Sequence, residues 1–166
     1  FTKMLDDTRP CVDSSGGYHT DETDLYDFHT YDGIEKAEKY LSAFESEGKL
    51  VMPLLMPEKA ECRAAAYRPG QPVMASEYGG IAYDPEASGW GYAAAATPKE
   101  LAGKAAELSR AYMNCPKLSG MCYTQLYDVE QEKNGLYYYD RTPKMNESEA
   151  EILRKVLRAP AKIEKE

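Results

Sequence analysis

Glu77 is the carboxylate in this sequence whose neighbours most suggest a chemical role. It lies in the stretch VMASEYGG, residues 73–80, at the end of an apolar run and shortly before two glycines. An ionised carboxylate is costly to remove from water unless it is paired or takes part in a reaction. A glutamate at the carboxyl end of a buried strand, followed by a glycine turn, is where an α/β enzyme holds a catalytic acid. The alternative is a structural carboxylate tied to an arginine or to backbone N–H groups.

Polar or aromatic residues also end two other predicted strands. His29 and Tyr31 end one of them, and Gln125 and Asp128 end another. The carboxyl ends of parallel strands meet at one edge of a sheet, so these side chains are expected near Glu77.

Four predicted strands alternate with helical patterns. The strands are expected over residues 10–15, 23–33, 72–78 and 118–128. Helices are expected over 34–48, from the Thr97-Pro98 capping signal onward, and from about 146–149 onward. A short helix over 61–67 is a further candidate, in a region where two prolines exclude a longer element.

Apolar spacing identifies the face that each helix buries. The predicted core positions are Ile34, Ala37, Tyr40, Leu41 and Phe44 in the first helix, Leu101, Ala105, Leu108 and Tyr112 in the second, and Ile152, Leu153, Val156 and Leu157 in the last.

The alternation of strand and helix predicts a parallel sheet built by right-handed crossovers. An α/β barrel and a flavodoxin-like open sheet share this alternation. The open sheet would be expected to carry a glycine-rich phosphate loop, and no GxGxxG or GxxxxGK[ST] spacing occurs.

Composition limits the function classes. The 166 residues suffice for one domain, and the net charge of −8 without a basic block argues against nucleic-acid binding. Fourteen tyrosines suit either an aromatic cleft that binds sugars or a tyrosine-rich packing surface.

The four cysteines and two histidines show no zinc-site spacing, so no metal or other cofactor is expected. Free thiols indicate a reducing compartment, which favours the cytoplasm, with the periplasm as the alternative. No apolar run of membrane-spanning length and no secretory signal is evident. The chain begins with Phe in mid-element, which is typical of a piece of a longer protein.

The blocks DDTRPCVDSSGG, TDLYDFHTYDG, PVMASEYGG, GWGY and SGMCYTQLYDVEQEKNGLYYYDRTPK follow one another along the chain. In this order they resemble glycoside hydrolase family 2, which holds β-galactosidases, β-glucuronidases and β-mannosidases. The resemblance covers about residues 5 to 145. It implies that residues 1–166 are the second half, strands 5 to 8, of a (β/α)8 TIM-barrel catalytic domain.

The resemblance also implies that Glu77 is the nucleophile of a retaining mechanism, which needs two carboxyl groups about 5 Å apart. In the family, the acid/base glutamate follows an asparagine at the end of strand 4, which would precede residue 1. Asp24, Asp27, Asp32 and Asp128 lie near strand ends, but none follows an asparagine. The acid/base residue is therefore expected to be absent from this chain.

Other positions carry over as substrate-binding candidates. Tyr31 matches a family tyrosine that hydrogen-bonds the nucleophile, and His29 would point into the sugar subsite; the alternatives are core packing and a histidine satisfied by the backbone. Trp90 would stack on a sugar or staple its loop. Tyr123 falls where relatives have a tryptophan platform, and Gln125 would bond sugar hydroxyls or brace the rim.

Two further residues receive structural roles. Asp128 is expected to brace the barrel rim, and Arg9 is expected to make a structural ion pair.

The resemblance leaves the sugar open. The β-glucuronidases of the family hold the uronate with an Asn-x-Lys motif, whereas Lys133 and Asn134 occur here in the opposite order. A β-galactosidase-like hydrolase is favoured, with a β-glucuronidase-like activity or a non-catalytic carbohydrate-binding or assembly fragment as alternatives.

The expected partners are a carbohydrate, the missing N-terminal half of the barrel with its accessory β-domains, and a second copy in a homo-oligomer. A half barrel would leave sheet edges exposed, so the isolated chain is expected to be inactive. A flavodoxin-like domain would instead have a complete sheet.

Overall fold

A three-stranded parallel sheet forms the centre of the chain, which we describe from a computed structural model over residues 1–16, 18–48, 50 and 67–165. Its strands are β1 (Tyr26–Thr30), β2 (Val73–Gly79) and β5 (Leu118–Thr124), in the order β1-β2-β5. Three of the predicted strands are thus confirmed, two of them in shorter form. The strands lie side by side in chain order, with no reversal of direction along the sheet.

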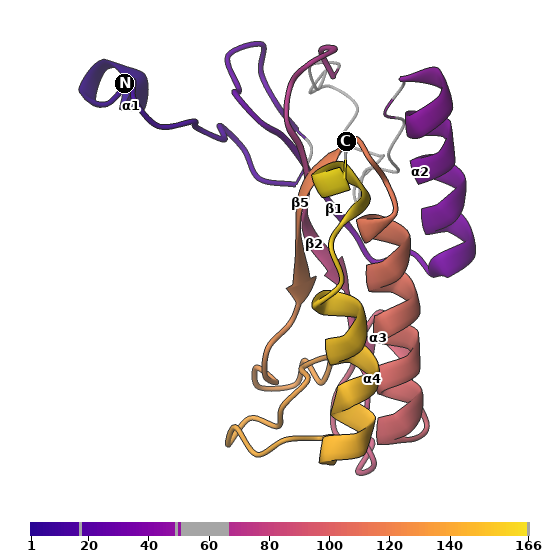
Figure 1. Cartoon of the computed structure of the whole chain (residues 1–166). Helices are drawn as coiled ribbons and strands as arrows, with labels where there is room; N and C mark the ends of the chain where they lie inside the picture. Colours follow the sequence, from indigo (N-terminus) through magenta and orange to yellow (C-terminus); the bar gives the residue numbers. More distant parts are fainter. Residues whose placement is uncertain (17, 49, 51–66, 166) are drawn as a thin grey trace.

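Three long helices cover one face of this sheet (Figure 1). They are α2 (Ile34–Glu47), α3 (Pro98–Met113) and α4 (Glu147–Leu157). The remaining elements are the short helix α1 (Thr2–Leu5), the paired two-residue strands β3 (Ile81–Ala82) and β4 (Ala93–Ala94), and the 3-10 turn η1 (Lys162–Lys165).

The helix boundaries follow the capping signals of the sequence. Thr97 accepts a hydrogen bond from the Glu100 backbone N–H at 3.1 Å, and Pro98 occupies the first turn of α3. Asn146 and Glu149 form a reciprocal capping box at the start of α4. Gly48 ends α2 with a φ of +67°, a left-handed conformation that glycine adopts without a steric penalty.

The core lies between the sheet and the helices, and most predicted positions are buried there. Ile34 and Ile152 are only partly buried, and Leu157, in the last turn of α4, is 46% exposed. Buried tyrosines fill much of this core. The hydroxyls of Tyr40 and Tyr112 lie 2.6 Å apart, and the hydroxyl of Tyr78 lies 2.7 Å from Ser109 Oγ. Each of these three buried hydroxyl groups therefore has a hydrogen-bond partner.

The strand predicted over residues 10–15 is wrong. This segment is an irregular loop in which the Asp13 carboxylate accepts hydrogen bonds from the Ser14 N–H at 2.8 Å and the Thr20 N–H at 2.6 Å. Local bonds from an aspartate to the backbone compete with a strand ladder and favour a loop. The short helix predicted over 61–67 lies outside the described residues except for Tyr67.

A bulge in β2 determines on which face of the sheet the Glu77 carboxylate lies. Ala75 pairs with Phe28 and Glu77 pairs with His29, so β2 has one residue more than β1 between these pairs. The extra residue is Ser76, and the register against β5 shifts over the same stretch. Strict alternation from the buried Val73 and Ala75 would direct the side chain at position 77 into the core; the bulge puts Tyr78 there instead.

Candidate active site

Glu77 lies on the face of the sheet opposite the core, beside two of the residues predicted to accompany it. The Tyr31 hydroxyl donates a hydrogen bond to Glu77 Oε2, and His29 Nδ1 lies 3.3 Å from the same oxygen. The Glu77 side chain is 38% exposed and the His29 side chain 18%. The bulge therefore brings together a carboxylate, a phenol and an imidazole at the ends of two adjacent parallel strands.

Electrostatics keep this phenol protonated. Burial and then the hydrogen bond to the Glu77 carboxylate raise the pKa of Tyr31 well above its ordinary range. Tyr31 is therefore a hydrogen-bond donor to Glu77 at every physiological pH. Within the described residues no lysine or arginine forms an ion pair with Glu77, so an arginine-tied structural carboxylate finds no support there.

Aromatic rings extend the site away from Glu77. The rings of Tyr31 and Tyr92 stack with centroids 3.7 Å apart and planes 3° apart, and Trp90 meets Tyr92 edge-on at 5.5 Å. Gly80 lies beneath the stacked pair with a φ of +64°; a Cβ there would come within 2.6 Å of the Tyr31 ring. Trp90 thus reaches the site through Tyr92 and is itself 50% exposed.

Two other predicted site residues lie elsewhere. The Tyr123 ring packs on the helix-covered side, 5.5 Å from Tyr78 and against both hydrophobic clusters, so it does not lie beside Glu77. Burial raises the pKa of Tyr123. Gln125 donates to Asn134 Oδ1 at 2.9 Å, and its carbonyl accepts from the Leu136 N–H at 3.1 Å. These contacts join the residue after β5 to the loop that contains Asn134 and Leu136.

Both residues given structural roles make ion pairs. Asp128 pairs at 2.7 Å with Lys144, whose side chain is fully buried, and it also accepts from the Gly135 N–H at 3.0 Å. Arg9 pairs with Asp6 at 2.6 Å on an exposed surface. The ion pair expected for Arg9 is thus present, and the expectation that Asp128 braces a barrel rim stays a prediction.

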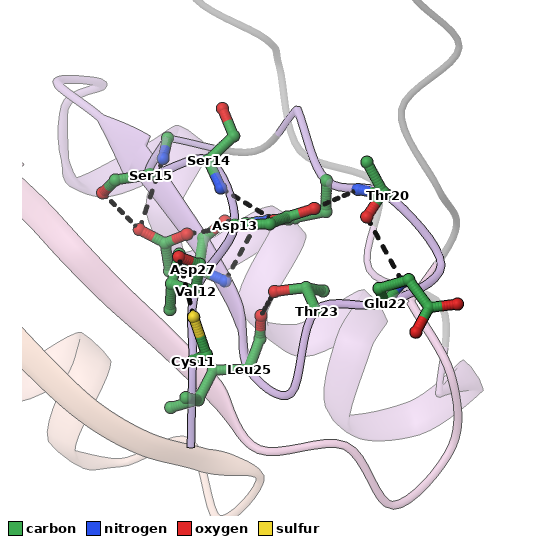
Figure 2. A network of polar contacts seen from close by, with 12 residues as sticks. Cys11, Val12, Asp13, Ser14, Ser15, Thr20, Glu22, Thr23, Leu25 and Asp27 are labelled. Carbon is green, nitrogen blue, oxygen red and sulfur yellow. Dashed lines mark hydrogen bonds and ion pairs between the residues drawn. The ribbon is translucent and has the colours of Figure 1, made fainter. Parts of the chain in front are cut away.

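Sequence reasoning missed the polar groups behind His29. Ser15 donates to Asp27 Oδ2 at 2.7 Å and lies 3.1 Å from His29 Nε2; Ser76 also donates to Asp27 Oδ2 (Figure 2 shows the contact between Ser15 and Asp27). Asp27 could have been found, since it precedes His29 by two residues and a strand places both on one face. Ser15 could not, because its loop is irregular.

The described residues contain no group of three or more His, Cys, Asp or Glu side chains placed to hold a metal ion. Cys11, Cys115 and Cys122 are free thiols. No helix in the described part of the chain has the length and apolar character needed to cross a membrane.

Comparison with known proteins gives a likeness in fold. No protein-family model and no curated protein matches the sequence. A β-glucuronidase from an uncultured Clostridium species shares 16% identity with a TM-score of 0.55, covering 95% of this chain and 28% of that one. The enzyme from Dictyoglomus thermophilum shares 17% with a TM-score of 0.53, covering 96% and 28%.

A third structure, Bifidobacterium dentium β-glucuronidase complexed with coumarin-3-O-glucuronide, shares 18% with a TM-score of 0.51, covering 92% and 25%. The chain thus spans about a quarter of the length of the structures it matches. At these identities the likeness concerns the fold.

Proposed function

We propose that this chain is part of the (β/α)8 catalytic barrel of a retaining β-glycosidase, with Glu77 as the nucleophile. The observation that carries the proposal is the Glu77 carboxylate at the end of β2, held by Tyr31 and His29 on the face opposite α2, α3 and α4. The fold likeness to β-glucuronidase structures supports it.

The order of the strands supports a barrel over a flavodoxin-like sheet. Right-handed crossovers that always step in the same direction place every helix on one face, as in a barrel; an open doubly wound sheet reverses its strand order and carries helices on both faces. Here the order is β1-β2-β5 without reversal, and α2, α3 and α4 lie on the same face. We therefore propose a barrel segment that residues outside this chain complete.

In the proposed reaction Glu77 attacks the anomeric carbon as the glycosidic C–O bond breaks. The leaving oxygen takes a proton from an acid/base glutamate, which we place upstream of residue 1. Water then attacks the anomeric carbon, gives its proton to that residue, and releases both the sugar and Glu77. Tyr31 and His29 both contact Oε2, and no hydrogen bond from the described residues reaches Oε1, so Oε1 is the attacking oxygen.

For the sugar we propose a β-galactoside first and a β-glucuronide as the alternative. The alternative draws on the fold neighbours, which are β-glucuronidases. The Asn134 side chain, in contrast, is fully buried and bonded to Gln125 and Glu132, so it is not free to hold a uronate. A non-catalytic carbohydrate-binding fragment is the remaining candidate, because the acid/base residue lies outside the chain in this proposal.

The proposed partners are a carbohydrate, the upstream half of the barrel with its accessory β-domains, and a second copy of the chain. The proposed compartment is the cytoplasm, supported by the free thiols of Cys11, Cys115 and Cys122. Nucleic acid is not a proposed partner.

The test is intact-mass analysis after incubation with dinitrophenyl 2-deoxy-2-fluoro-β-glycosides. Dinitrophenolate leaves without a proton, so the upstream acid is not needed for the labelling step. We expect one glycosyl adduct on Glu77, from the galactoside or the glucuronide, on a longer chain that includes the upstream strands. Glu77→Gln should abolish the adduct, and Glu86→Gln, at an exposed position, should leave it unchanged.

The outcomes separate the candidates. Labelling of the longer chain but not of the 166-residue chain would mean that the short chain carries the nucleophile without a complete site. If no glycoside labels the longer chain, the retaining-glycosidase proposal is wrong.

A further inference from the structure

A buried carboxylate, Asp27, lies behind His29 on the same strand as the candidate site. Its side chain is 3% exposed, and its Oδ2 accepts hydrogen bonds from the Ser15 hydroxyl at 2.7 Å, from the Gly16 N–H at 3.3 Å and from the Ser76 hydroxyl. Figure 2 shows Ser15 in contact with Asp27, and Asp13 next to them. Three hydrogen-bond donors thus converge on a single oxygen of this carboxyl group.

The direction of the Ser15 hydrogen bond determines the proton on His29. A serine hydroxyl has one proton, and in Ser15 it goes to Asp27. Ser15 Oγ can then only accept at its contact with His29 Nε2, 3.1 Å away, so Nε2 must carry a proton. The other ring nitrogen, Nδ1, is left facing Glu77 Oε2 at 3.3 Å.

The charged groups around His29 agree with this arrangement. The carboxylates of Asp27, on the same strand at 4.0 Å, and of Glu77, on β2, face the two nitrogens of the ring. Gly16, in the loop, lies close to the His29 ring: a Cβ atom added at Gly16 would be 3.1 Å from His29 Nδ1. Among the described residues no lysine or arginine pairs with either carboxylate. The contact between Nδ1 and Glu77 Oε2 therefore has no competing cation beside it in the described part of the chain.

We propose that Asp27 is a positioning residue for the candidate nucleophile. Acting through Ser15, it fixes the proton on His29 Nε2 and thereby directs Nδ1 toward Glu77 Oε2. This inference rests on the proposed function for its catalytic meaning, because it assumes that Glu77 is the nucleophile. The position of the proton on His29 does not depend on that assumption.

The loop that provides Ser15 is anchored by a second pair. The fully buried His19 ring lies 2.9 Å from Asp13 Oδ1 through Nδ1, and its Nε2 lies 2.8 Å from the Asp27 carbonyl oxygen and 3.2 Å from the Asp27 backbone nitrogen. Burial opposes ionisation of Asp13, but hydrogen bonds from Thr20, His19 and Ser14 outweigh it and hold the pKa of that carboxyl well below its usual range. An ionised Asp13 thus ties the loop to β1 and keeps Ser15 over Asp27.

The alternative is that the Ser15 hydroxyl donates its proton to His29 Nε2 instead of to Asp27. Ser15, His29 and Glu77 would then form a triad with Ser15 as the nucleophile. The contact with Asp27 is shorter, at 2.7 Å against 3.1 Å, and a carboxylate is the stronger acceptor. The Gly16 N–H, in the loop beside Ser15, donates to Asp27 at 3.3 Å and is therefore not free to form an oxyanion hole. The positioning role is therefore the one that the geometry favours.

The proton can be observed directly, because the chain has two histidines. Two-bond proton–nitrogen correlation spectra of the 166-residue chain, labelled with 15N-histidine, report which ring nitrogens are protonated, and His29→Gln assigns the signals. We expect a protonated His29 Nε2 at neutral pH in the native chain. Ser15→Ala should remove this preference, and Ser14→Ala, at the neighbouring exposed serine, should retain it. Ser15→Thr should restore it.

A second readout connects the proton to the reaction. On the longer chain, Ser15→Ala and Asp27→Asn should slow the labelling of Glu77 by about 10- to 100-fold, the scale of a misplaced reacting group. Ser14→Ala should leave the rate unchanged, and Ser15→Thr, which keeps the hydroxyl, should be faster than Ser15→Ala. If the Asp27→Asn variant does not fold, the comparison of Ser15→Ala with Ser15→Thr tests the proposal.

The two readouts fail separately. An unprotonated His29 Nε2 in the native chain, or Ser15→Ala spectra identical to the native ones, would overturn the positioning role whatever the labelling shows. The expected spectra without labelling of any variant would leave the Asp27–Ser15–His29 proton arrangement established and refute the nucleophile role of Glu77.

Discussion

The two faces of the sheet formed by β1, β2 and β5 differ in how they satisfy polar groups. On the helix-covered face the buried hydroxyls of Tyr40, Tyr78 and Tyr112 are bonded to one another or to threonine and serine. On the opposite face the carboxylates of Asp27 and Glu77 collect donors from two strands and a loop.

This difference shows that one face of a sheet can contribute to stability while the other holds reactive groups. On the helix-covered face these three hydroxyls are paired with other neutral groups, which adds little charge there. The open face keeps ionised groups that would be costly to bury without partners. Mutations on the first face should therefore change the free energy of unfolding, whereas mutations at Glu77 should change reactivity.

The largest effect on stability is expected for Phe44→Ala. Phe44 is completely buried and its ring meets Tyr67 edge-on at 5.2 Å. Removing it should lower the free energy of unfolding by about 3–5 kcal/mol, through lost apolar burial and the cavity left behind. Urea denaturation measures this. Leu126→Ala, at a position 63% exposed, is the control and should change stability by less than about 0.5 kcal/mol.

High pH should weaken the helix-covered face. Burial raises the pKa of Tyr40, Tyr78 and Tyr112 above the ordinary tyrosine value. Above about pH 10 the unfolded chain then loses protons that the folded chain keeps, so stability present below that pH falls as the pH rises. Urea midpoints between about pH 8 and 11 should decrease, and a constant midpoint would show that these tyrosines titrate alike in both states.

Tyr78→Phe tests a single polar pair within that face. The change leaves Ser109 Oγ, in a fully buried residue, without its partner at 2.7 Å. We expect a loss of about 1–3 kcal/mol in the free energy of unfolding, because an unsatisfied buried hydroxyl keeps its desolvation cost. Tyr139→Phe, at a 64% exposed position, is the matched control and should have no measurable effect.

The smallest effect on stability is expected for Glu77→Gln. The side chain is 38% exposed and glutamine keeps an oxygen that can accept from Tyr31, so the free energy of unfolding should change by less than about 1 kcal/mol. Thermal or urea denaturation checks this on the variant that should lose labelling. A loss above about 2 kcal/mol would instead assign Glu77 to the structural framework and remove the contrast between the faces.

Local signals in the sequence were sufficient for the helices. Capping at Thr97 and Asn146 and the left-handed end at Gly48 depend on residues within one turn, so the boundaries of α3 and α4 and the end of α2 were predictable. The strand over 10–15 was mispredicted because Asp13 bonds the nearby backbone, a choice that a short apolar pattern does not reveal.

The position of Glu77, His29 and Tyr31 near the carboxyl ends of neighbouring parallel strands was predictable from the order of strands in the sequence. Only the tertiary structure decided the face on which Glu77 lies, because a one-residue bulge at Ser76 reverses the alternation. It also placed the Tyr123 ring in the core and brought Ser15 to Asp27 and His29. These outcomes depend on contacts between residues distant along the chain, which local patterns do not encode.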